Sequence, residues 1–490
     1  MNLLRVLGNL LHGSRCFAMA IAVAAGLILG PFSSVHAETA SVPIPDTERQ
    51  VLINLYTNTS GDDWSDNSNW CSGSCPGAFN SAGTECTWLG VTCAGAPPHV
   101  TAIALSANGL VGTLPELANL PALKSIDVSS NELSGSIPPL GSLTALTAFN
   151  ANSNQLSGSI PALASLTALL SFEAGSNLLT GSIPSLSGLT SLAKFRVFSN
   201  QLTGPIPALA GLTALIEIDV NSNQLTGQIP ELAGLTALTE FVVYSNQLTG
   251  SIPALDGLTA LAFFNAESND LSGSIPSLGA LTGLIAFNVR GNQLTGPIPS
   301  LSGLPALTYV TMSENQLTGS IPALSGLTTL NEFFVDSNQL SGPIPSLTGL
   351  TGLAYFVAFQ NQLSGSIPSL AGLTSLFVFD VSSNRLSGTI PPLAASTALN
   401  YFSVGQNQLT GSIPALDALT SLNLFSVGHN HLSGQLPAAP ASLLSPGSAI
   451  LCPNDFPESS YVDDAGWDLA TDSTPWYTPC NLVFFNGFEL

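Results

Sequence analysis

The chain has 490 residues, of which 45% are hydrophobic and only 8% are charged, so it is too apolar for an extended disordered chain and too long for one ordinary core. Its formal net charge is −22, from 8 Lys and Arg against 30 Asp and Glu, which excludes attraction to nucleic acid or to an anionic membrane through bulk electrostatics. We therefore expect several domains or a repeat array, and no nucleic-acid partner.

The first 37 residues (1–37) have the features of a secretory signal peptide. Arg5 and Arg15 supply positive charge, and residues 17–30 form an apolar core that is short for a membrane span. Residues 35–37 (VHA) offer the small-x-small pattern that signal peptidase recognises. Because no later stretch is apolar enough to cross a bilayer, we predict no transmembrane segment and a secreted or cell-surface location.

Residues 38–99 are expected to form a cap before the repeats. Residues 46–59 (DTERQVLINLYTNT) predict a short helix, and Thr47 and Gln50 fit a capping box at its start. The apolar face of this helix consists of Val51, Leu52, Leu55 and Tyr56.

Residues 100–437 repeat every 23 residues without an insertion or a deletion. Two glycines and a proline in most units would break helices, so a helical array explains the pattern poorly. A period of 23 with this apolar spacing is typical of leucine-rich repeats, and fifteen of them fill this region. One asparagine marks each unit: Asn108, Asn131, Asn154, Asn177, Asn200, Asn223, Asn246, Asn269, Asn292, Asn315, Asn338, Asn361, Asn384, Asn407 and Asn430.

The third repeat illustrates the physics of one unit. Phe149 and Ala151 alternate as a short strand requires and are expected to point inward. The amide of Asn154 can donate and accept at once, so we expect it to satisfy buried backbone groups of the neighbouring coil. Gly158 and Pro161 favour an extended return path that is poor in strands.

Phenylalanine occupies the first inward strand position in eleven of the fifteen units. We interpret this column as a stacked aromatic core in preference to a ligand site. A lone unit cannot bury its apolar face, whereas stacked neighbours make the core continuous. The sequence therefore predicts an α/β solenoid, a right-handed leucine-rich-repeat horseshoe with a parallel β-sheet on the concave side and a helix-poor convex side.

The segment S-x-N-x-L-x-G-x-I-P resembles the plant-type leucine-rich repeat of receptor-like kinases and polygalacturonase inhibitors. Residues 61–64 (GDDW), 69–70 (NW) and 86–93 (CTWLGVTC) are similar to the amino-terminal cap of that family. The plant unit usually has 24 residues where this one has 23, and the near-identical units and scarce lysines look more like bacterial proteins of this kind. No specific plant role, such as inhibiting a pectinase, is carried over.

Six of the seven cysteines lie outside the signal segment, and an even number in an exported chain favours disulfide bonds over zinc. The resemblance implies a Cys86–Cys93 bond in the cap, which leaves Cys71–Cys75 as the remaining bond there. Residues 438–490 lie beyond the repeats and contain Trp467 and Trp476. We predict that they cover the last coil, closed by a Cys452–Cys480 bond, because an open solenoid end would expose its apolar core.

Residues between the inward strand positions are expected to face the concave surface, where packing does not constrain them. Their side chains vary here while the rest of the unit hardly changes, and exposed aromatics on one surface are typical of binding sites. The predicted partner-binding residues are Lys194, Arg196, Phe198, Glu217, Asp219, Glu240, Tyr244, Phe263, Glu267, Arg290, Tyr309, Glu332, Phe334, Asp336, Tyr355, Phe359 and Tyr401.

Each basic residue on this surface has an acidic neighbour one strand away. Lys194 is expected beside Glu217, Arg196 beside Asp219, and Arg290 beside Glu267. Two interpretations stay open, namely simple neutralisation within the sheet and a patterned surface that orients a partner.

Motifs of catalysis or metal binding are weak in this sequence. His429 and His431 lack a third ligand, and Asp62, Asp63 and Asp66 lack the glycine and terminal glutamate of a calcium loop. We predict no cofactor, no metal and no enzymatic activity. The favoured function is a recognition module that binds an extracellular protein or carbohydrate on the concave face. The alternatives are a structural, surface-coating or ice-binding repeat protein and, less favoured, a polysaccharide-acting enzyme; the sequence indicates no oligomeric state.

Overall fold

The computed structural model describes residues 42–73, 75, 78–443, 445–457 and 465–477. The chain divides into two compact units, Met1–Val42 and Pro43–Leu490, and the fold described below belongs to the second unit. The predicted signal segment and Cys480 lie outside the described residues. Within the described residues, no helix combines the length and the apolar character that a membrane crossing requires.

The amino-terminal cap begins with the predicted helix, α3 (Asp46–Asn58), followed by two short 3-10 helices, η1 (Gly61–Asp63) and η2 (Glu85–Thr87). The predicted apolar face of α3 is buried. The predicted capping box is wrong, because Pro45 occupies the N-cap position and no side chain caps the helix. The fixed φ of proline favours the backbone conformation at a helix start. Proline has no side-chain oxygen, so this helix begins without the hydrogen bond that a serine or threonine cap would make.

Aromatic rings form the core of this cap. Trp64, Trp70 and Trp88 are buried, with ring centroids 5.2 Å apart for the first two and 4.8 Å apart for the last two. Disulfide bonds join Cys71 to Cys75 and Cys86 to Cys93. A short chain segment with few core positions gains most from such covalent links.

A buried carboxylate fastens α3 to the first strands. The Glu48 side chain is only 1% exposed, and its oxygens lie 2.5 Å from His99 Nδ1 and 2.8 Å from the backbone nitrogen of Val100, which donates to it. A buried carboxylate needs such partners, because leaving it unpaired would cost several kcal/mol, on the order of 3 kcal/mol or more.

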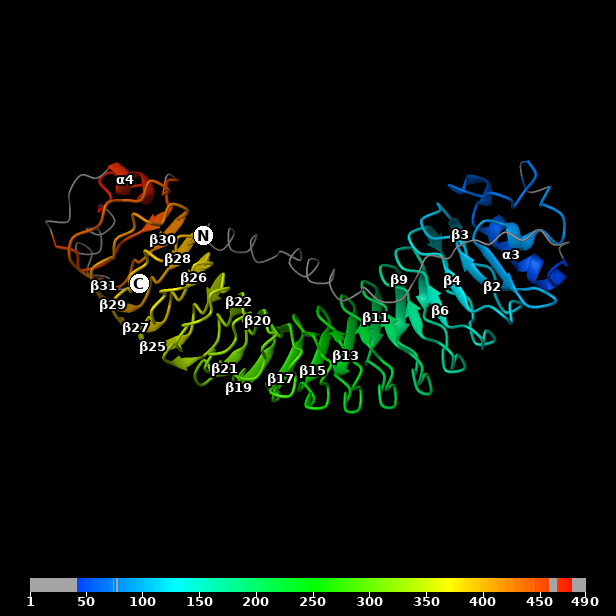
Figure 1. Ribbon diagram of the computed structural model, residues 1–490, viewed down its shortest axis with the longest axis horizontal. Coiled ribbons are helices and arrows are strands. Elements are labelled where there is room, and N and C mark those ends of the chain that lie inside the picture. Colours follow the sequence, from blue (N-terminus) through cyan, green and yellow to red (C-terminus); the bar gives the residue numbers. More distant parts are fainter. Residues whose placement is uncertain (1–41, 74, 76–77, 444, 458–464, 478–490) are drawn as a thin grey trace. The chain divides into compact units, whose positions relative to one another are not determined.

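The repeats stack coil upon coil into an arc whose inner side is lined by one long sheet (Figure 1). Its strands are parallel to one another except for the antiparallel first pair, β1 and β2. The predicted parallel solenoid is confirmed. The strands of this inner sheet are β1 (Val91–Ala94), β2 (His99–Ala104), β4 (Ser125–Asp127), β6 (Ala148–Asn150), β8 (Ser171–Glu173), β10 (Lys194–Arg196), β12 (Glu217–Asp219), β14 (Glu240–Val242), β16 (Phe263–Asn265), β18 (Ala286–Asn288), β20 (Tyr309–Thr311), β22 (Glu332–Phe334), β24 (Tyr355–Val357), β26 (Val378–Asp380), β28 (Tyr401–Ser403), β30 (Leu424–Ser426) and β32 (Ala449–Ile450).

The inward phenylalanines stack as predicted. Phe241, Phe264 and Phe287 are fully buried in consecutive coils, with ring centroids 5.5 and 5.3 Å apart and interplanar angles of 15° and 16°. The parallel register places each ring directly beside the next, as between Phe241 and Phe264. The column is therefore part of the hydrophobic core and offers no ligand site.

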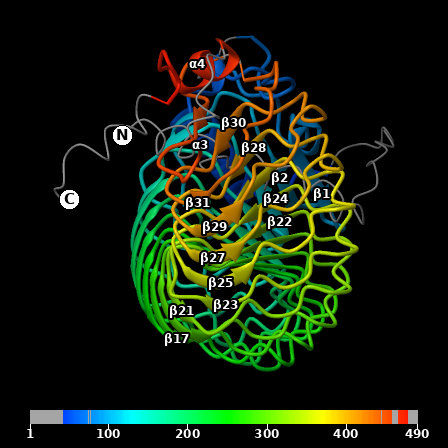
Figure 2. The same cartoon turned by 90° about the vertical axis from the view of Figure 1, so that its left-hand side faces the viewer.

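The return path carries a second series of strands, so the prediction that it is poor in strands is wrong. The segment after each asparagine is extended, and its backbone groups pair with those of the next coil; for example, Ser157 N donates to Gly135 O at 2.7 Å. Figure 2 shows the later members of this series beside the inner strands. The outer strands are β3 (Val111–Thr113), β5 (Glu132–Ser134), β7 (Ser157–Ser159), β9 (Leu178–Ser182), β11 (Gln201–Gly204), β13 (Gln224–Gln228), β15 (Gln247–Gly250), β17 (Asp270–Ser274), β19 (Gln293–Pro297), β21 (Gln316–Thr318), β23 (Ser341–Gly342), β25 (Gln362–Ser366), β27 (Arg385–Gly388), β29 (Gln408–Gly411) and β31 (His431–Leu432).

The asparagine of each unit bonds to backbone groups, as predicted. Asn200 Oδ1 accepts a hydrogen bond from Leu179 N at 2.9 Å, while Nδ2 donates to Ala174 O at 3.0 Å and to Val197 O and Phe198 O at 3.1 Å. One side chain thus satisfies groups of its own coil and of the preceding coil. This explains why an amide, with both donor and acceptor, occupies the position.

The solenoid continues past the predicted end at residue 437. β32 pairs in parallel with β30, and Asn454 extends the asparagine series one residue beyond the 23-residue interval. Its Oδ1 accepts a hydrogen bond from Leu432 N at 2.9 Å. The helix α4 (Ala465–Thr471) then places buried Trp467 6.2 Å from Phe425, the last ring of the core column. The predicted Cys452–Cys480 bond involves a residue outside the described ones and stays a prediction.

Candidate binding surface

The inner sheet arranges its outward side chains in three columns, which together we call the concave face. In β10, Phe195 points into the core, so Lys194 before it and Arg196 after it point outward. Phe198 belongs to a third column just past the strand. Equivalent positions of neighbouring coils lie side by side in register, as Lys194 does with Glu217.

All seventeen predicted partner-binding residues fall in these columns. The first column contains Lys194, Glu217, Glu240, Phe263, Tyr309, Glu332, Tyr355 and Tyr401. The second contains Arg196, Asp219 and Phe334, and the third contains Phe198, Tyr244, Glu267, Arg290, Asp336 and Phe359.

Side chains on this face cover one another more than the sequence suggests. Four of the seventeen predicted residues are buried and the other thirteen are half-buried. Neighbouring parallel strands lie only about 4.8 Å apart, so large side chains in one column pack laterally. The four buried residues support their neighbours more than they offer contact area themselves: Glu217, Phe263, Phe334 and Asp336.

Arg196 pairs with acids, but along diagonals between columns and not with its lateral neighbour. Lys194 and Arg196 lie in register with Glu217 and Asp219, as predicted. The guanidinium of Arg196 nevertheless bonds to Glu217, and its Nη1 lies 3.6 Å from Glu173. A long arginine side chain reaches the neighbouring column more easily than it folds back onto a short aspartate, so register alone does not identify its partner.

Arg290 forms a second such group. Its Nη1 lies 3.7 Å from Glu267, the predicted neighbour, and its Nη2 donates to Glu314 at 2.7 Å. Glu314 was not among the predicted residues. A signal was present, because glutamate there replaces the serine that precedes the asparagine in most units.

Burial changes the ionisation of several carboxylates on the concave face. It raises the pKa of Asp219 to about 6, against hydrogen bonds from Asn221 that lower it. Burial likewise raises the pKa of Asp336 to about 6, although Ser313 Oγ donates to it at 2.5 Å. The pKa of Glu240 is also raised by burial. The face therefore changes charge in mildly acidic solution.

Aromatic residues gather between β20 and β26. The Phe334 ring lies 6.2 Å from the Tyr309 ring and 6.1 Å from the Tyr355 ring, between centroids. Phe377, which precedes β26, lies 5.9 Å from Tyr355 and is 37% exposed. It was not predicted because it stands one position before the first column.

Aromatic residues of the third column are more widely spaced. Phe198, Tyr244 and Phe359 are half-buried and stand in separate coils. Gly175 leaves room for the first of them, since a Cβ there would lie 2.5 Å from a ring carbon of Phe198. Burial raises the pKa of the Tyr244 hydroxyl.

A buried polar group follows toward the carboxyl-terminal end of the face. Asp380 is only 3% exposed, and its Oδ1 accepts hydrogen bonds from the backbone nitrogen and the hydroxyl of Ser382 at 3.0 and 2.6 Å. The Tyr401 hydroxyl donates to its Oδ2 at 3.3 Å. Burial raises the pKa of both Asp380 and Tyr401, so this pair resists ionisation.

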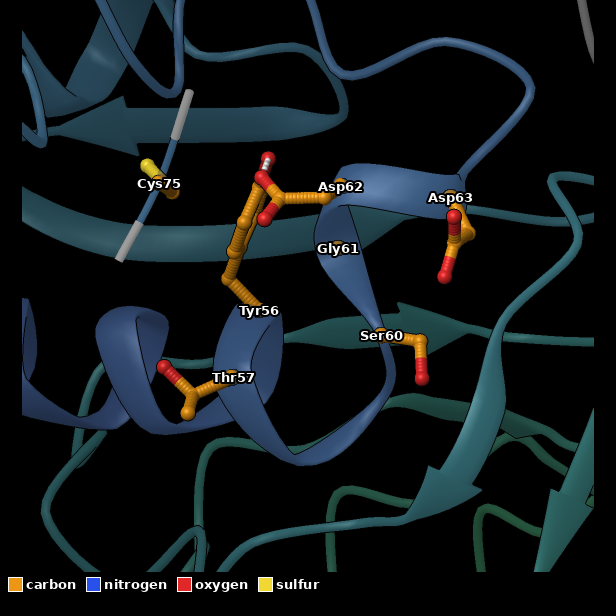
Figure 3. Close-up of a pocket in the computed structure, with 7 residues that line it drawn as sticks. All are labelled: Tyr56, Thr57, Ser60, Gly61, Asp62, Asp63 and Cys75. Atoms are coloured by element: carbon orange, nitrogen blue, oxygen red, sulfur yellow. Dashed lines mark hydrogen bonds between the residues drawn. The ribbon is translucent and has the colours of Figure 1, made fainter. Parts of the chain in front are cut away.

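Two of the acidic residues of the amino-terminal cap, Asp62 and Asp63, line a small pocket (Figure 3). The Tyr56 hydroxyl donates to Asp62 Oδ1 at 2.9 Å, and Asp63 lies beside them on η1. His431 near the other end lies 3.1 Å from Asp455. Across the described residues, no group of three or more histidine, cysteine or acidic side chains is placed to hold a metal ion.

The outer strands offer a chemically uniform surface. Exposed glutamines follow the asparagine in most coils, for example Gln201, Gln224 and Gln247, and a threonine or serine such as Thr203 or Ser157 stands two residues after them. This regularity contrasts with the varied chemistry of the concave face.

Comparison with known proteins agrees with this architecture. Residues 122–142 match the model of the Leucine Rich Repeat family. A TDR receptor structure is similar with a TM-score of 0.56 and 27% identity, covering 67% of this chain and 73% of that chain. The ectodomain of the Arabidopsis thaliana membrane receptor kinase GASSHO1/SCHENGEN3, solved in complex with CASPARIAN STRIP INTEGRITY FACTOR 2, is similar with a TM-score of 0.51 and 29% identity. That match covers 84% of this chain and 62% of the ectodomain, so the chain spans less than two thirds of its length. No curated protein matches the sequence.

The repeat, the asparagine series and these matches define the fold as a solenoid of leucine-rich repeats. Its helix-poor solenoid is consistent with a plant-type leucine-rich-repeat architecture, since it is similar to the leucine-rich-repeat ectodomain of a plant membrane receptor kinase.

Proposed function

We propose that this protein is an exported recognition module that binds a peptide or protein partner, or a glycan, on its concave face, without catalysing a reaction. One observation carries the proposal. Side chains of varied charge and shape collect on the outward side of the inner sheet, while most other positions repeat with little change and serve stacking. Varied aromatic and charged groups on one surface are what selective binding requires.

The similar structures support the same class of function. GASSHO1/SCHENGEN3 was solved with CASPARIAN STRIP INTEGRITY FACTOR 2 bound, and it shares 29% identity with this chain. Export is supported by the composition of residues 1–37 and by the disulfide bonds of the cap, which persist in oxidising compartments.

Selection from a displayed library of random peptides tests the proposal. The wild-type protein and a variant carrying Phe198→Ala, Tyr244→Ala and Phe359→Ala are immobilised and exposed to the same library. We expect the wild type to enrich a defined set of peptides and the variant to lose most of that set, because three half-buried aromatic contacts are removed.

A matched control changes the outer side of the same three coils, with Gln201→Ala, Gln247→Ala and Gln362→Ala. This control is expected to retain the wild-type set. The proposal is wrong for peptides and proteins if the wild type enriches nothing, and the concave location is wrong if both variants behave alike. Circular dichroism of each variant establishes that it is folded.

The uniform outer strands favour a second candidate, a surface-coating or ice-binding role. A regular array of exposed glutamine and threonine side chains suits a repetitive surface better than a unique partner. A thermal-hysteresis measurement on the purified protein tests it. Hysteresis that the outer glutamine variant abolishes and the concave variant retains would favour this candidate over the first.

A further inference from the structure

Three adjacent strands bring aromatic rings around one carboxylate. Tyr309 lies in register with Glu332, and Glu332 lies in register with Tyr355, so the carboxylate stands between two tyrosines of the same column. Phe334 is buried and supports them from the next column, with its ring 6.2 and 6.1 Å from the two tyrosine rings. We call Tyr309, Glu332, Phe334 and Tyr355 the aromatic box.

The carboxylate of Glu332 lacks the partners that other acids of this face have. Within the part of the chain that the structure describes, it makes no hydrogen bond or ion pair, and burial alone raises its pKa. Glu217 and Glu267, by contrast, pair with arginines. Glu240 is also without a hydrogen bond, but it lies in the field of Lys194 and Arg196. Glu332 is thus a partly desolvated charge without compensation.

The chain has few cations with which to neutralise it. Only 8 of its 490 residues are lysine or arginine. Arg290 is occupied by Glu267 and Glu314. Arg385 belongs to the outer strand β27 and is exposed there. Among the described residues, no lysine or arginine forms an ion pair with Glu332, so a bound molecule could supply the positive charge that it lacks there.

We propose that the aromatic box binds a cationic side chain, a lysine ammonium or an arginine guanidinium, of the ligand on the concave face. The inference rests on the proposed function, which supplies that ligand. Aromatic faces attract a cation through their quadrupoles, and a carboxylate beside them adds a charge-assisted hydrogen bond. Both interactions are strengthened where water is partly excluded.

A direct test uses small probes and needs no knowledge of the natural ligand. N-acetyl-arginine amide and N-acetyl-citrulline amide have nearly the same shape, but only the first carries a charge. Binding of each to the full-length mature protein is measured by equilibrium titration. We expect the arginine probe to bind about tenfold more tightly, since a charge-assisted hydrogen bond is worth roughly 1.5 kcal/mol or more.

Two variants test whether the preference for the arginine probe depends on Glu332. Glu332→Gln keeps the shape of the side chain and removes its charge, so the preference for arginine is expected to disappear. Glu240→Gln removes a half-buried carboxylate of the same column outside the box, and the preference is expected to persist. Equal binding of the two probes by the wild type, or loss of the preference in both variants, overturns the aromatic box.

The peptide library separates this inference from the proposed function. If the box is correct, peptides enriched by the wild type share a lysine or arginine at one position, and Glu332→Gln abolishes that preference. Enriched peptides without a shared cation would overturn the box while leaving the binding function in place. Arginine-probe binding that depends on Glu332, with no peptide enriched, would support the box and count against a peptide ligand.

Discussion

At the residue scale, a buried polar side chain stabilises the fold when it has hydrogen-bond partners and destabilises the fold when it has none. The asparagine amides bond fully to backbone groups, as Asn269 does with Val243 O and Ala266 O. Glu332, by contrast, gives up part of its hydration and gains no partner within the described residues. A charge held in this way lowers stability, so its value to the protein lies in what it binds.

Replacing Glu332 with glutamine is expected to stabilise the protein. The folded pKa of Glu332 lies above its ordinary value of 4.5, so its ionised form is disfavoured by folding and the cost is fully present above the folded pKa. At pH 7 we expect Glu332→Gln to raise the free energy of unfolding by about 0.5 kcal/mol after allowing for solvent screening. Chemical denaturation measures it. The gain should vanish below about pH 4, and a gain that is independent of pH would contradict the explanation.

Replacing an asparagine of the series is expected to have the opposite effect. In Asn269→Ala, Leu248 N loses its acceptor and three carbonyl groups lose a shared donor. We expect a loss of about 1–3 kcal/mol in the free energy of unfolding. The neighbouring exposed Gln247→Ala is the control and should change stability by less than about 0.5 kcal/mol. Equal effects of both would contradict the assigned role of the amide.

At the scale of elements, each coil is stabilised by contact with its two neighbours. The inward rings stack from strand to strand, while outward side chains pack laterally in columns. The curvature that exposes the concave face thus comes from the same strands that bury the core. An element of this kind has no stability of its own, since one coil cannot bury its apolar side.

Removing one ring of the stacked phenylalanine column tests whether neighbouring coils stabilise one another. Phe264 is fully buried between Phe241 and Phe287, so Phe264→Ala is expected to cost about 3–5 kcal/mol. Ile216→Ala provides a control, because Ile216 is 40% exposed. The midpoint of thermal unfolding measures both changes. A small effect for Phe264→Ala would mean that the stacked column contributes little.

Most of the inner strands and their core positions could be predicted from the 23-residue period of the sequence alone. The inward positions, the asparagine bonds and the parallel sheet are dictated by a 23-residue unit, because each position must meet its equivalent in the next coil. The outer strands were not predicted, since Ser157 and its equivalents occupy no pattern that distinguishes a paired from an unpaired extended segment. The bond of Arg196 to Glu217 instead of Asp219 depends on side-chain reach, which the sequence does not encode in its spacing.

At the scale of the whole molecule, the excess of acidic residues makes the chain strongly negative, and the fold partly buries some of these carboxylates on the concave face. The net charge is −22, and desolvated carboxylates on the concave face resist ionisation. That Glu332 has no partner among the described residues could not be read from the sequence, because it depends on where the cations of those residues lie in space. Glu314 could have been found, since it places a charge at a position that is serine in most units.

The stability of the whole solenoid is expected to rise in mildly acidic solution. Asp219 and Asp336 have a folded pKa of about 6 against an ordinary value of 3.8, so the folded state binds more protons between these values. The free energy of unfolding should therefore increase by roughly 1–3 kcal/mol as pH falls from about 6 to 4, and stay nearly constant above 7. Thermal unfolding across this range measures it, and a maximum at pH 7 or above would count against the stated pKa shifts.

Photo-cross-linking tests most directly whether a partner contacts the concave face, while the repeated positions serve stacking. A peptide enriched by the wild-type protein is synthesised with a benzophenone side chain, irradiated in complex with the protein, and the attached residues are identified by mass spectrometry. We expect attachment to the three columns of the inner sheet, between β10 and β28. Attachment mainly to the outer strands or to either cap would contradict the account.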